Sequence, residues 1–259
     1  MIRAVLFDLD DTLVPEASAW ERAFAAACAD CELDAAVDVV ELRRCVFKVA
    51  RELWQGSPVS AWCRTAGIGS PSSLLSDFPG EGRELEFLRG WSPLYRITAW
   101  RAGLAQAGIR DAGASHALSD AFRRAFAVNH RPFDDVLPAL DNLTGMSLAV
   151  ITNGASDLQR AKLRVAGLER YFPAALISGE LGFGKPDGRI FRLALDELGV
   201  SAAEAVMVGD SPERDIAGAV DAGLRALWLD RAGASETPLA PHRRIESLRQ
   251  LADVLSKLG

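Results

Sequence analysis

Hydrophobic and polar positions divide the chain into stretches of different texture. Four short apolar runs without polar alternation lie in the second half of the chain, with the sequences SLAVIT, AALIS, AVMVG and RALWL. A further run, RAVLFDL at residues 3–9, ends in acidic residues. Short runs of this kind are typical of parallel strands that are buried on both faces. Each run is therefore predicted to be a buried strand.

Helical segments separate the later runs. Helices are predicted over residues 157–165, 189–198 and 215–222, where the pattern changes from continuous apolar runs to helical spacing. Strands that alternate with helices through short connections indicate a doubly wound α/β fold. An isolated strand is not stable, so the run at 3–9 is expected to join the same sheet. The pattern predicts a Rossmann-like core with a parallel sheet.

A long stretch of different texture lies between the first strand and the others. From about Ala17 to Val128 the pattern is helical, with Ala, Leu, Trp and Arg at three- and four-residue spacing. Residues 67–93 hold most of the local Gly, Pro and Ser, and we expect at least one mobile loop there. We predict a catalytic core of residues 1–15 and 132–259 with an inserted all-helical cap of residues 16–131.

The inserted region is rich in tryptophan and arginine. Most of its tryptophans are expected in its core, and most of its arginines on a solvated helix face. The tryptophans are Trp20, Trp54, Trp62, Trp91 and Trp100, and the arginines include Arg43, Arg44, Arg51 and Arg96.

Composition excludes some classes of partner. The chain has 259 residues and a formal net charge of −6. An acidic chain lacks the basic stripe that nucleic-acid binding needs, so we expect no nucleic-acid partner. No run approaches the ~20 apolar residues of a membrane-spanning helix, and the first strand is too short for a signal peptide. We therefore expect a cytoplasmic protein without a membrane partner, as a monomer or a homodimer.

The cysteines agree with a reducing compartment. Cys28 and Cys31 form a lone C-x-x-C inside a helical pattern. A zinc site needs a second pair of ligands, and no other pair in the sequence has suitable spacing. The cysteines are therefore predicted to be small apolar residues rather than metal ligands or a redox pair.

Polar residues of the types that handle phosphate follow the predicted strands. In chain order they are Asp8, Asp10, Thr152, Asn153, Gly154, Lys185, Asp210 and Asp215. Because ligands of such sheets bind beyond the carboxyl ends of the strands, we expect these residues to form one site.

The carboxylates of this set indicate a cation. Asp8 and Asp10 are two residues apart at the end of the strand, so their side chains point to the same side of it. Two neighbouring carboxylates repel each other, and both stay ionised when a cation lies between them. Several carboxylates around one pocket suit Mg²⁺, which prefers oxygen ligands. Mg²⁺ would neutralise phosphate oxygens and leave Asp8 free to attack phosphorus. Thr152 can donate its hydroxyl to a phosphate oxygen, and Lys185 can offset the charge of the transition state.

Four motifs in the chain resemble those of the haloacid dehalogenase superfamily, in the order that the superfamily has them. They are DLDDT at 8–12, ITNG at 151–154, GKPD at 184–187 and VGDSPERD at 208–215. The resemblance covers residues 1–15 and 132–259, and the inserted region matches a cap by position and helical character. Small-molecule phosphatases with a helical cap, such as the pyrimidine 5′-nucleotidases, are similar members.

The resemblance implies a role for each acidic residue. Asp8 would be the nucleophile that forms an aspartyl phosphate, and Asp10 the general acid and base. Asp8, the Asp10 carbonyl and Asp210 would bind Mg²⁺, and Asp215 would bind it through water or hold Lys185. Members that release halide lack a carboxylate at the position of Asp10, so phosphate chemistry is favoured.

The remaining motif residues would contact the substrate. By the same resemblance, Thr152 and Lys185 belong to the catalytic set. Asn153 and Gly154 would bind the phosphate or substrate, and Asn153 would otherwise orient the nucleophile.

The sequence thus predicts a Mg²⁺-dependent phosphatase whose partner is a small phosphomonoester, either a nucleotide or a sugar phosphate. Two alternatives stay open. A phosphomutase would use the same intermediate and return the phosphoryl group to the sugar. A non-catalytic regulator would carry a phospho-acceptor aspartate, although receiver domains are about half this length and lack an acid at the position of Asp10.

Overall fold

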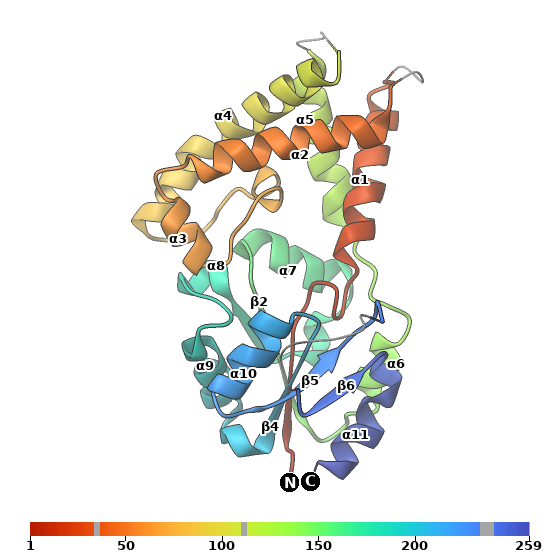
Figure 1. Ribbon diagram of the computed structural model, residues 1–259, viewed down its shortest axis with the longest axis vertical. Coiled ribbons are helices and arrows are strands. Elements are labelled where there is room, and N and C mark those ends of the chain that lie inside the picture. The colour runs from red at the N-terminus through yellow and green to blue at the C-terminus, as the bar shows by residue number, and fades with distance from the viewer. Residues whose placement is uncertain (34–36, 110–112, 234–240, 259) are drawn as a thin grey trace. The chain divides into compact units, whose positions relative to one another are not determined.

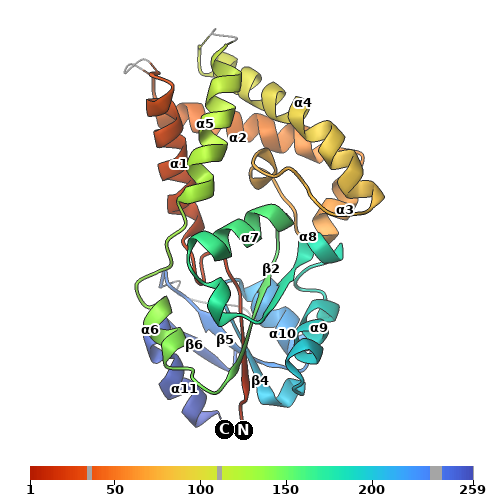
Figure 2. The ribbon, with the colours of Figure 1, turned by 180° about the vertical axis from the view of Figure 1, so that it is seen from behind.

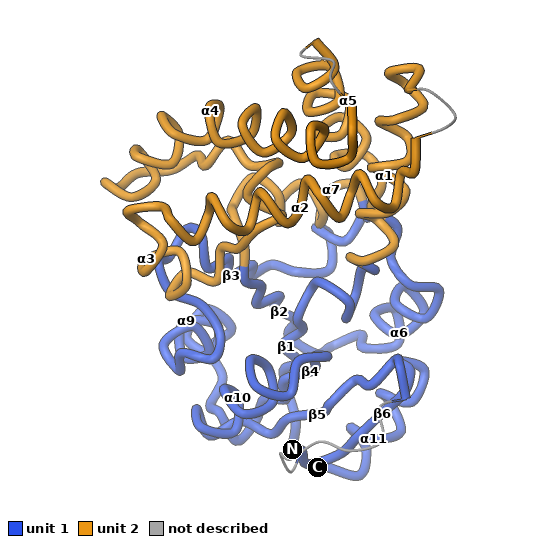
Figure 3. The backbone as a smooth tube through the Cα atoms, turned by 45° about the horizontal axis from the view of Figure 1, so that its top comes forward, with its two compact units in different colours: residues 1–15, 131–153, 166–259 blue, residues 16–130, 154–165 orange. Residues whose placement is uncertain are grey.

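The computed structural model describes residues 1–33, 37–109, 113–233 and 241–258 (Figure 1). These residues form two compact units, coloured differently in Figure 3. The sheet unit comprises residues 1–15, 131–153 and 166–259, and the helical unit comprises residues 16–130 and 154–165. This division differs from the predicted boundaries at residue 131 and at residues 154–165, which group with the helices.

The sheet unit contains, among its described residues, a six-stranded sheet with the strand order β3-β2-β1-β4-β5-β6. The strands are β1 (Ala4–Phe7), β2 (Ser147–Thr152), β3 (Ala174–Ile177), β4 (Ala205–Gly209), β5 (Arg225–Leu229) and β6 (Arg243–Ile245). Every neighbouring pair is parallel. The chain continues from β1 to β2 on one side and later returns to β4 on the other, which confirms the predicted doubly wound α/β fold.

Helices and short turns of the sheet unit lie between these strands or follow the last of them. They are α6 (Val136–Asp141), η2 (Glu169–Tyr171), α8 (Ser178–Leu181), α9 (Gly188–Leu198), η3 (Ala202–Glu204), η4 (Pro212–Ala217), α10 (Gly218–Asp221), η5 (Leu248–Gln250) and α11 (Leu251–Lys257). The helix predicted over 215–222 is in fact a π-helical turn followed by α10.

The helices cover both faces of the sheet. Helices α9 and α10 lie together on one face and α6 and α11 on the other (Figures 1 and 2). On the first face Phe191 and Ile216 pack against Leu6, Ile151 and Met207. Because both faces are buried, the central strands read as continuous apolar runs. The edge strand β6, with the sequence RRI, has two exposed residues and no such run, so the sequence did not predict it.

The helical unit confirms the helical pattern of the inserted region. Its elements are α1 (Glu16–Asp30), α2 (Val39–Gln55), α3 (Ser60–Thr65), η1 (Ser72–Leu74), α4 (Arg83–Gln106), α5 (Ala114–Val128) and α7 (Ser156–Val165). Aromatic rings form much of its core, where Phe24 stacks on Trp100 with centroids 5.2 Å apart. Trp20 and Trp54 are buried as well. No helix in the described part of the chain combines the length and hydropathy of a membrane span.

The Gly-, Pro- and Ser-rich stretch at 67–93 contains both a loop and the start of a long helix. Residues 75–82 lie outside any helix or strand, so a loop is present within the stretch, as predicted. Helix α4 then begins at Arg83 and contains Pro93. The buried side chains of Leu85 and Leu88 outweigh the helix-breaking tendency of a single proline, as tertiary packing often does.

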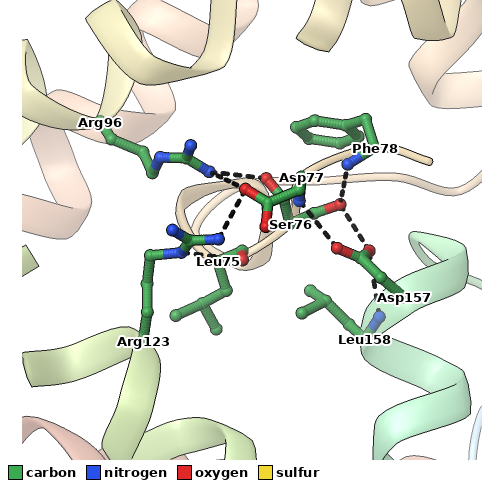
Figure 4. Close-up of polar contacts among 8 residues, drawn as sticks. All are labelled: Leu75, Ser76, Asp77, Phe78, Arg96, Arg123, Asp157 and Leu158. Atoms are coloured by element: carbon green, nitrogen blue, oxygen red, sulfur yellow. Dashed lines mark hydrogen bonds and ion pairs between the residues drawn. The ribbon is translucent and has the colours of Figure 1, made fainter. Parts of the chain in front are cut away.

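The remaining part of this stretch is bound to neighbouring helices by polar contacts (Figure 4). Arg96 of α4 donates to the Ser76 carbonyl at 2.7 Å and lies 3.2 Å from the Asp77 carboxylate. Arg123 of α5 donates to Asp77 at 2.6 Å. Asp157 of α7 accepts hydrogen bonds from the Ser76 hydroxyl at 2.6 Å and the Asp77 N–H at 2.7 Å. These contacts favour a fixed conformation around Ser76 over a mobile one.

Arg96 corrects one expectation about the surface of the inserted region. Its residue is only 8% exposed, so it does not lie on a solvated helix face. A buried guanidinium requires hydrogen-bond acceptors and an opposite charge, and Ser76 and Asp77 supply them.

The four cysteines are free thiols. Burial raises the pKa of Cys28 to about 11 and that of Cys63 to about 11. A buried, protonated thiol is a poor nucleophile and metal ligand. Cys28, Cys45 and Cys63 are buried, as predicted for apolar residues, whereas Cys31 is partly exposed.

Candidate active site

The centre of the site lies at the carboxyl end of β1. Asp8 follows the strand directly, is only 7% exposed, and donates its N–H to the Val208 carbonyl of β4 at 2.9 Å. The chain then turns tightly, because the N–H groups of Leu13 and Val14 both donate to the Leu9 carbonyl. Asp11 has a positive φ of 56° within this turn. The turn places Asp10 and Thr12 immediately beside the end of β1.

Lys185 joins two of the buried carboxylates. Its Nζ lies 2.5 Å from Asp8 Oδ1 and 2.7 Å from Asp215 Oδ1. Asp215, which is 1% exposed, also accepts the Ser211 N–H at 2.9 Å through Oδ2. Gly209 is required here, because a Cβ at this position would overlap the Asp215 carboxylate. The contact between Asp215 and Lys185 is the one that the second implied role of Asp215, holding Lys185, requires.

Asn153 binds the backbone of Lys185 at both ends of its side-chain amide. Its Nδ2 donates to the Lys185 carbonyl at 2.8 Å, and its Oδ1 accepts the Lys185 N–H at 2.8 Å. Gly184 permits this approach, since a Cβ there would overlap Asn153 Oδ1. Thr152 precedes Asn153 as the buried last residue of β2. Gly154 follows with φ +148°, a conformation that favours glycine.

Asp210 follows β4 and faces the turn after β1. The Thr12 hydroxyl donates to Asp210 Oδ1 at 3.4 Å. The Trp228 indole N–H donates to the Asp210 carbonyl at 2.9 Å. The ends of β1, β2, β4 and the turn before α9 therefore bring the predicted residues of the sheet unit to one edge of the sheet, as their strand-end positions predicted.

Burial shifts the protonation equilibria of this site. It raises the pKa of Asp8 well above its ordinary value; Lys185 opposes this, and Asp215, Asp210 and Asp10 raise it further. Burial, with the charges of Asp215 and Asp11, likewise raises the pKa of Asp210 to about 6. Burial alone would lower the pKa of Lys185, but the two carboxylates outweigh it and raise that pKa. The site thus holds more negative charge than its lysine compensates.

The donor set fits a hard divalent cation. Asp8, Asp210 and Asp215 offer carboxylate oxygens that lie within 4.8 Å of one another. The pKa values of Asp8 and Asp210 are both raised, so a further positive charge beside them would favour their ionised forms. Oxygen ligands and a small number of protein groups suit Mg²⁺. Asp10 was predicted as a ligand through its backbone carbonyl, which this carboxylate cluster does not include.

Comparison with known proteins identifies the family. A family model described as haloacid dehalogenase-like hydrolase matches residues 2–223. The chain belongs to this family. The sequence-based identification of the family is therefore confirmed, and the protein is an enzyme, a hydrolase.

Known members of the family resemble it over much of its length. A phosphoserine phosphatase of Thermus thermophilus is 36% identical and covers 96% of this chain and 98% of that protein. The pyrimidine 5′-nucleotidase YjjG of Escherichia coli is 38% identical over 54% of this chain and 64% of its own length. The crystal structure of a 2-haloacid dehalogenase from Pseudomonas syringae covers 100% of both chains with a TM-score of 0.65 and 31% identity.

The sequence of this haloacid dehalogenase-like hydrolase did not point to every residue at the site. Trp228 and Arg231, which contact the acidic turns from the end of β5, had no assigned role. A signal was present, because they lie at and just beyond the carboxyl end of RALWL, as the other site residues do for their strands. Asn153 was expected to meet substrate or orient the nucleophile, and its contacts with Lys185 were not anticipated.

Proposed function

We propose that the protein is a Mg²⁺-dependent phosphatase that hydrolyses a small phosphomonoester through an aspartyl phosphate on Asp8. The observation that carries this proposal is the placement of Lys185 Nζ 2.5 Å from Asp8 Oδ1 and 2.7 Å from Asp215, beside Asp210. A buried carboxylate next to a fixed ammonium and further carboxylates is suited to attack a dianionic phosphoryl group with a cation present.

Asp8 and Asp10 divide the chemistry between them in this proposal. One carboxylate oxygen of Asp8 attacks phosphorus, the bond from phosphorus to the ester oxygen breaks, and Asp10 gives its proton to the leaving alcohol. Asp10 then takes a proton from water, whose oxygen attacks the same phosphorus and releases inorganic phosphate and free Asp8. Lys185 and the Thr152 hydroxyl stabilise the phosphoryl oxygens. Bound Mg²⁺, held by Asp8, Asp210 and the Asp10 carbonyl, would supply charge neutralisation.

The substrate class is a small phosphorylated metabolite. The similarity to a phosphoserine phosphatase over nearly the whole chain supports a phosphorylated amino acid as a candidate, and the shorter match to a pyrimidine 5′-nucleotidase supports a nucleotide. The sequence-based preference for a nucleotide or a sugar phosphate therefore widens to include O-phosphoserine.

The presence of Asp10 argues against halide release. One of the similar crystal structures is of a 2-haloacid dehalogenase, a reaction in which the leaving group is halide. A halide needs no proton when it leaves, whereas an alcohol does, so protonation of the leaving group is a use for this carboxylate that halide release lacks.

The test is phosphate release from a panel of O-phosphoserine, nucleoside monophosphates and sugar phosphates, with Mg²⁺ and with EDTA. We expect release with Mg²⁺ from the wild type and none from Asp8→Asn. Release that survives Asp8→Asn contradicts the mechanism. Turnover only with a sugar bisphosphate favours a phosphomutase, a stable phosphoprotein without turnover favours a regulator, and halide release from 2-chloropropionate favours a dehalogenase.

A further inference from the structure

The carboxyl end of β5 contacts both acidic turns of the site through their backbone carbonyls. Trp228 donates its indole N–H to the Asp210 carbonyl at 2.9 Å. Arg231 donates Nη2 to the Thr12 carbonyl at 2.9 Å. Thr12 in turn donates its hydroxyl to Asp210 at 3.4 Å. The turn after β1 and the turn after β4 are therefore both bound by side chains from the end of β5.

Arg231 is itself held in a defined orientation. Its Nη1 and Nη2 donate to the two carboxylate oxygens of Asp135 at 3.0 Å each. Its guanidinium lies 4.0 Å from the centroid of the Phe133 ring. Two parallel hydrogen bonds and a stacked ring restrict a guanidinium more than a single ion pair does. The donor that reaches the Thr12 carbonyl is thereby fixed in direction.

Asp135 is in turn fixed by other groups. It accepts the Ser247 hydroxyl at 2.7 Å and the Leu248 N–H at 2.8 Å. Burial would raise the pKa of Asp135, but the hydrogen bonds from Arg231, Ser247 and Leu248 outweigh it and lower that pKa. The carboxylate is therefore ionised at neutral pH, and it anchors Arg231 as a charged partner.

Trp228 is equally well placed. Its residue is 4% exposed, and its ring packs in the core between the sheet and α9 and α10. The Arg244 guanidinium lies 5.1 Å from its ring centroid. A buried indole with its N–H directed at one carbonyl fixes that carbonyl, and with it the start of the turn that carries Asp210.

We infer that Trp228 and Arg231 are positioning residues that hold Asp210 and the Asp10 turn in register for cation binding and catalysis. This inference rests on the proposed phosphatase function. Thr12 follows Asp10 by two residues, so a shift of its carbonyl moves the whole tight turn. Groups that orient metal ligands from behind typically change metal affinity or activity by about 10–100-fold when they are lost. A catalytic set tolerates displacements of only about 0.5 Å.

Two conservative variants test the inference. Arg231→Lys keeps the charge, but an ammonium cannot bind both Asp135 oxygens and the Thr12 carbonyl in the same fork geometry. Trp228→Phe keeps an aromatic ring and removes only the donor to Asp210 and part of the ring volume. If one variant fails to fold, the other still tests the inference.

Each variant has a matched control. Arg170→Lys replaces an exposed arginine of the sheet unit that also stacks on a ring, that of Tyr171 at 4.9 Å. Trp100→Phe replaces a fully buried tryptophan whose N–H has no acceptor among the described residues. The controls measure the effects of the same substitutions where no site carbonyl is involved.

The decisive readout is the dissociation constant of Mn²⁺ for the metal-free proteins, measured by the electron paramagnetic resonance of free Mn²⁺ alongside the melting temperature and kcat. We expect about tenfold weaker Mn²⁺ binding and a lower kcat for Arg231→Lys and Trp228→Phe, and wild-type affinity for both controls. If both test variants bind Mn²⁺ with wild-type affinity and differ from wild type only in a lower melting temperature, the inference is overturned while the proposed function stands. A wild type that neither binds Mn²⁺ nor releases phosphate overturns the proposed function as well.

Discussion

Lys185 and Asp8 form a buried ion pair in which Nζ lies 2.5 Å from Oδ1, although the two residues are 177 positions apart in the chain. The same nitrogen lies 2.7 Å from Asp215, so one ammonium is shared by two buried carboxylates. In the proposed mechanism, this ammonium would screen Asp8 from the negative charge of an incoming phosphate. It binds Asp8 Oδ1, which leaves Oδ2 as the oxygen proposed to attack.

Replacing Lys185 with methionine should reduce kcat by about 10²–10³-fold, since a fixed charge at the reacting group would be lost. The change also leaves two buried carboxylates without their cation, so the metal-free protein should melt at a lower temperature. Initial rates and melting curves check both effects. Lys257→Met, at an exposed lysine of α11, is the control. A folded Lys185→Met protein with kcat within threefold of wild type would falsify this role.

Asp10→Asn should slow the hydrolysis of phosphate esters with poor leaving groups far more than the hydrolysis of activated esters. An asparagine cannot protonate the leaving oxygen, and general acid catalysis contributes about 10²–10⁴-fold. The nitrophenolate of p-nitrophenyl phosphate needs little protonation, so Asp8 should still be phosphorylated. Hydrolysis of the aspartyl phosphate should then be slow, because Asp10 also activates water. Rapid-mix kinetics should therefore show a burst of nitrophenolate. An equal loss of rate for both kinds of ester, without a burst, would exclude Asp10 as the general acid and base.

The fold could be predicted because the features that specify it, the apolar strands and the polar residues at their ends, lie in short segments of the sequence. Strands that are buried on both faces, such as β2 and β4, consist mainly of apolar residues, and this is visible in the sequence. The polar residues at the strand ends converge because parallel strands share an edge. The exposed edge strand β6 has no such constraint, and only the structure reveals it.

The supporting contacts of the site could not be predicted in the same way. Asn153, Trp228 and Arg231 all bind backbone carbonyls, at Lys185, Asp210 and Thr12 respectively. Every residue type has a backbone carbonyl, so the identity of the accepting residue does not reveal which side chain binds it. The burial of Arg96 has the same origin, since its main acceptor is the Ser76 carbonyl.

Stability of the metal-free protein should rise as the pH falls from about 7 toward 5. The pKa of Asp210 is about 6 in the folded protein, and that of Asp8 is also raised. An unfolded aspartate has a pKa of about 3.9, so between these values the folded state binds more protons than the unfolded state. Stability therefore falls as the pH rises through the folded pKa. Melting temperatures measured in EDTA check this.

Melting temperatures measured with Mg²⁺, and those of the Asp210→Asn variant, complement the measurements in EDTA. Mg²⁺ should raise the melting temperature more at pH 7.5 than at pH 5, because it binds the ionised carboxylates. Asp210→Asn should lose part of the pH dependence, since one of the titrating groups is gone. A melting temperature in EDTA that increases steadily from pH 5 to pH 7.5 contradicts the prediction.

Ser76→Ala should destabilise the helical unit by about 1–3 kcal/mol, because the Asp157 carboxylate and the Phe78 N–H both lose a buried partner. Urea unfolding followed by tryptophan fluorescence suits this test, since the helical unit contains every tryptophan except Trp228. Ser72→Ala is the control, because among the described residues the Ser72 hydroxyl donates in an exposed contact to the Gly69 carbonyl. Equal, small effects of both changes would mean that the contacts around Ser76 contribute little.

Asn153→Asp should lower kcat by up to about 10²-fold with little change in KM. The carboxylate can still accept the Lys185 N–H, but it cannot donate to the Lys185 carbonyl and places an oxygen against it. The backbone of Lys185 should move, and a displacement of about 1 Å at a reacting group costs about that factor. The exposed Asn142→Asp change is the control for the added charge. If Asn153 mainly contacts the substrate instead, KM should rise and kcat should stay near that of wild type, so the two constants separate the roles.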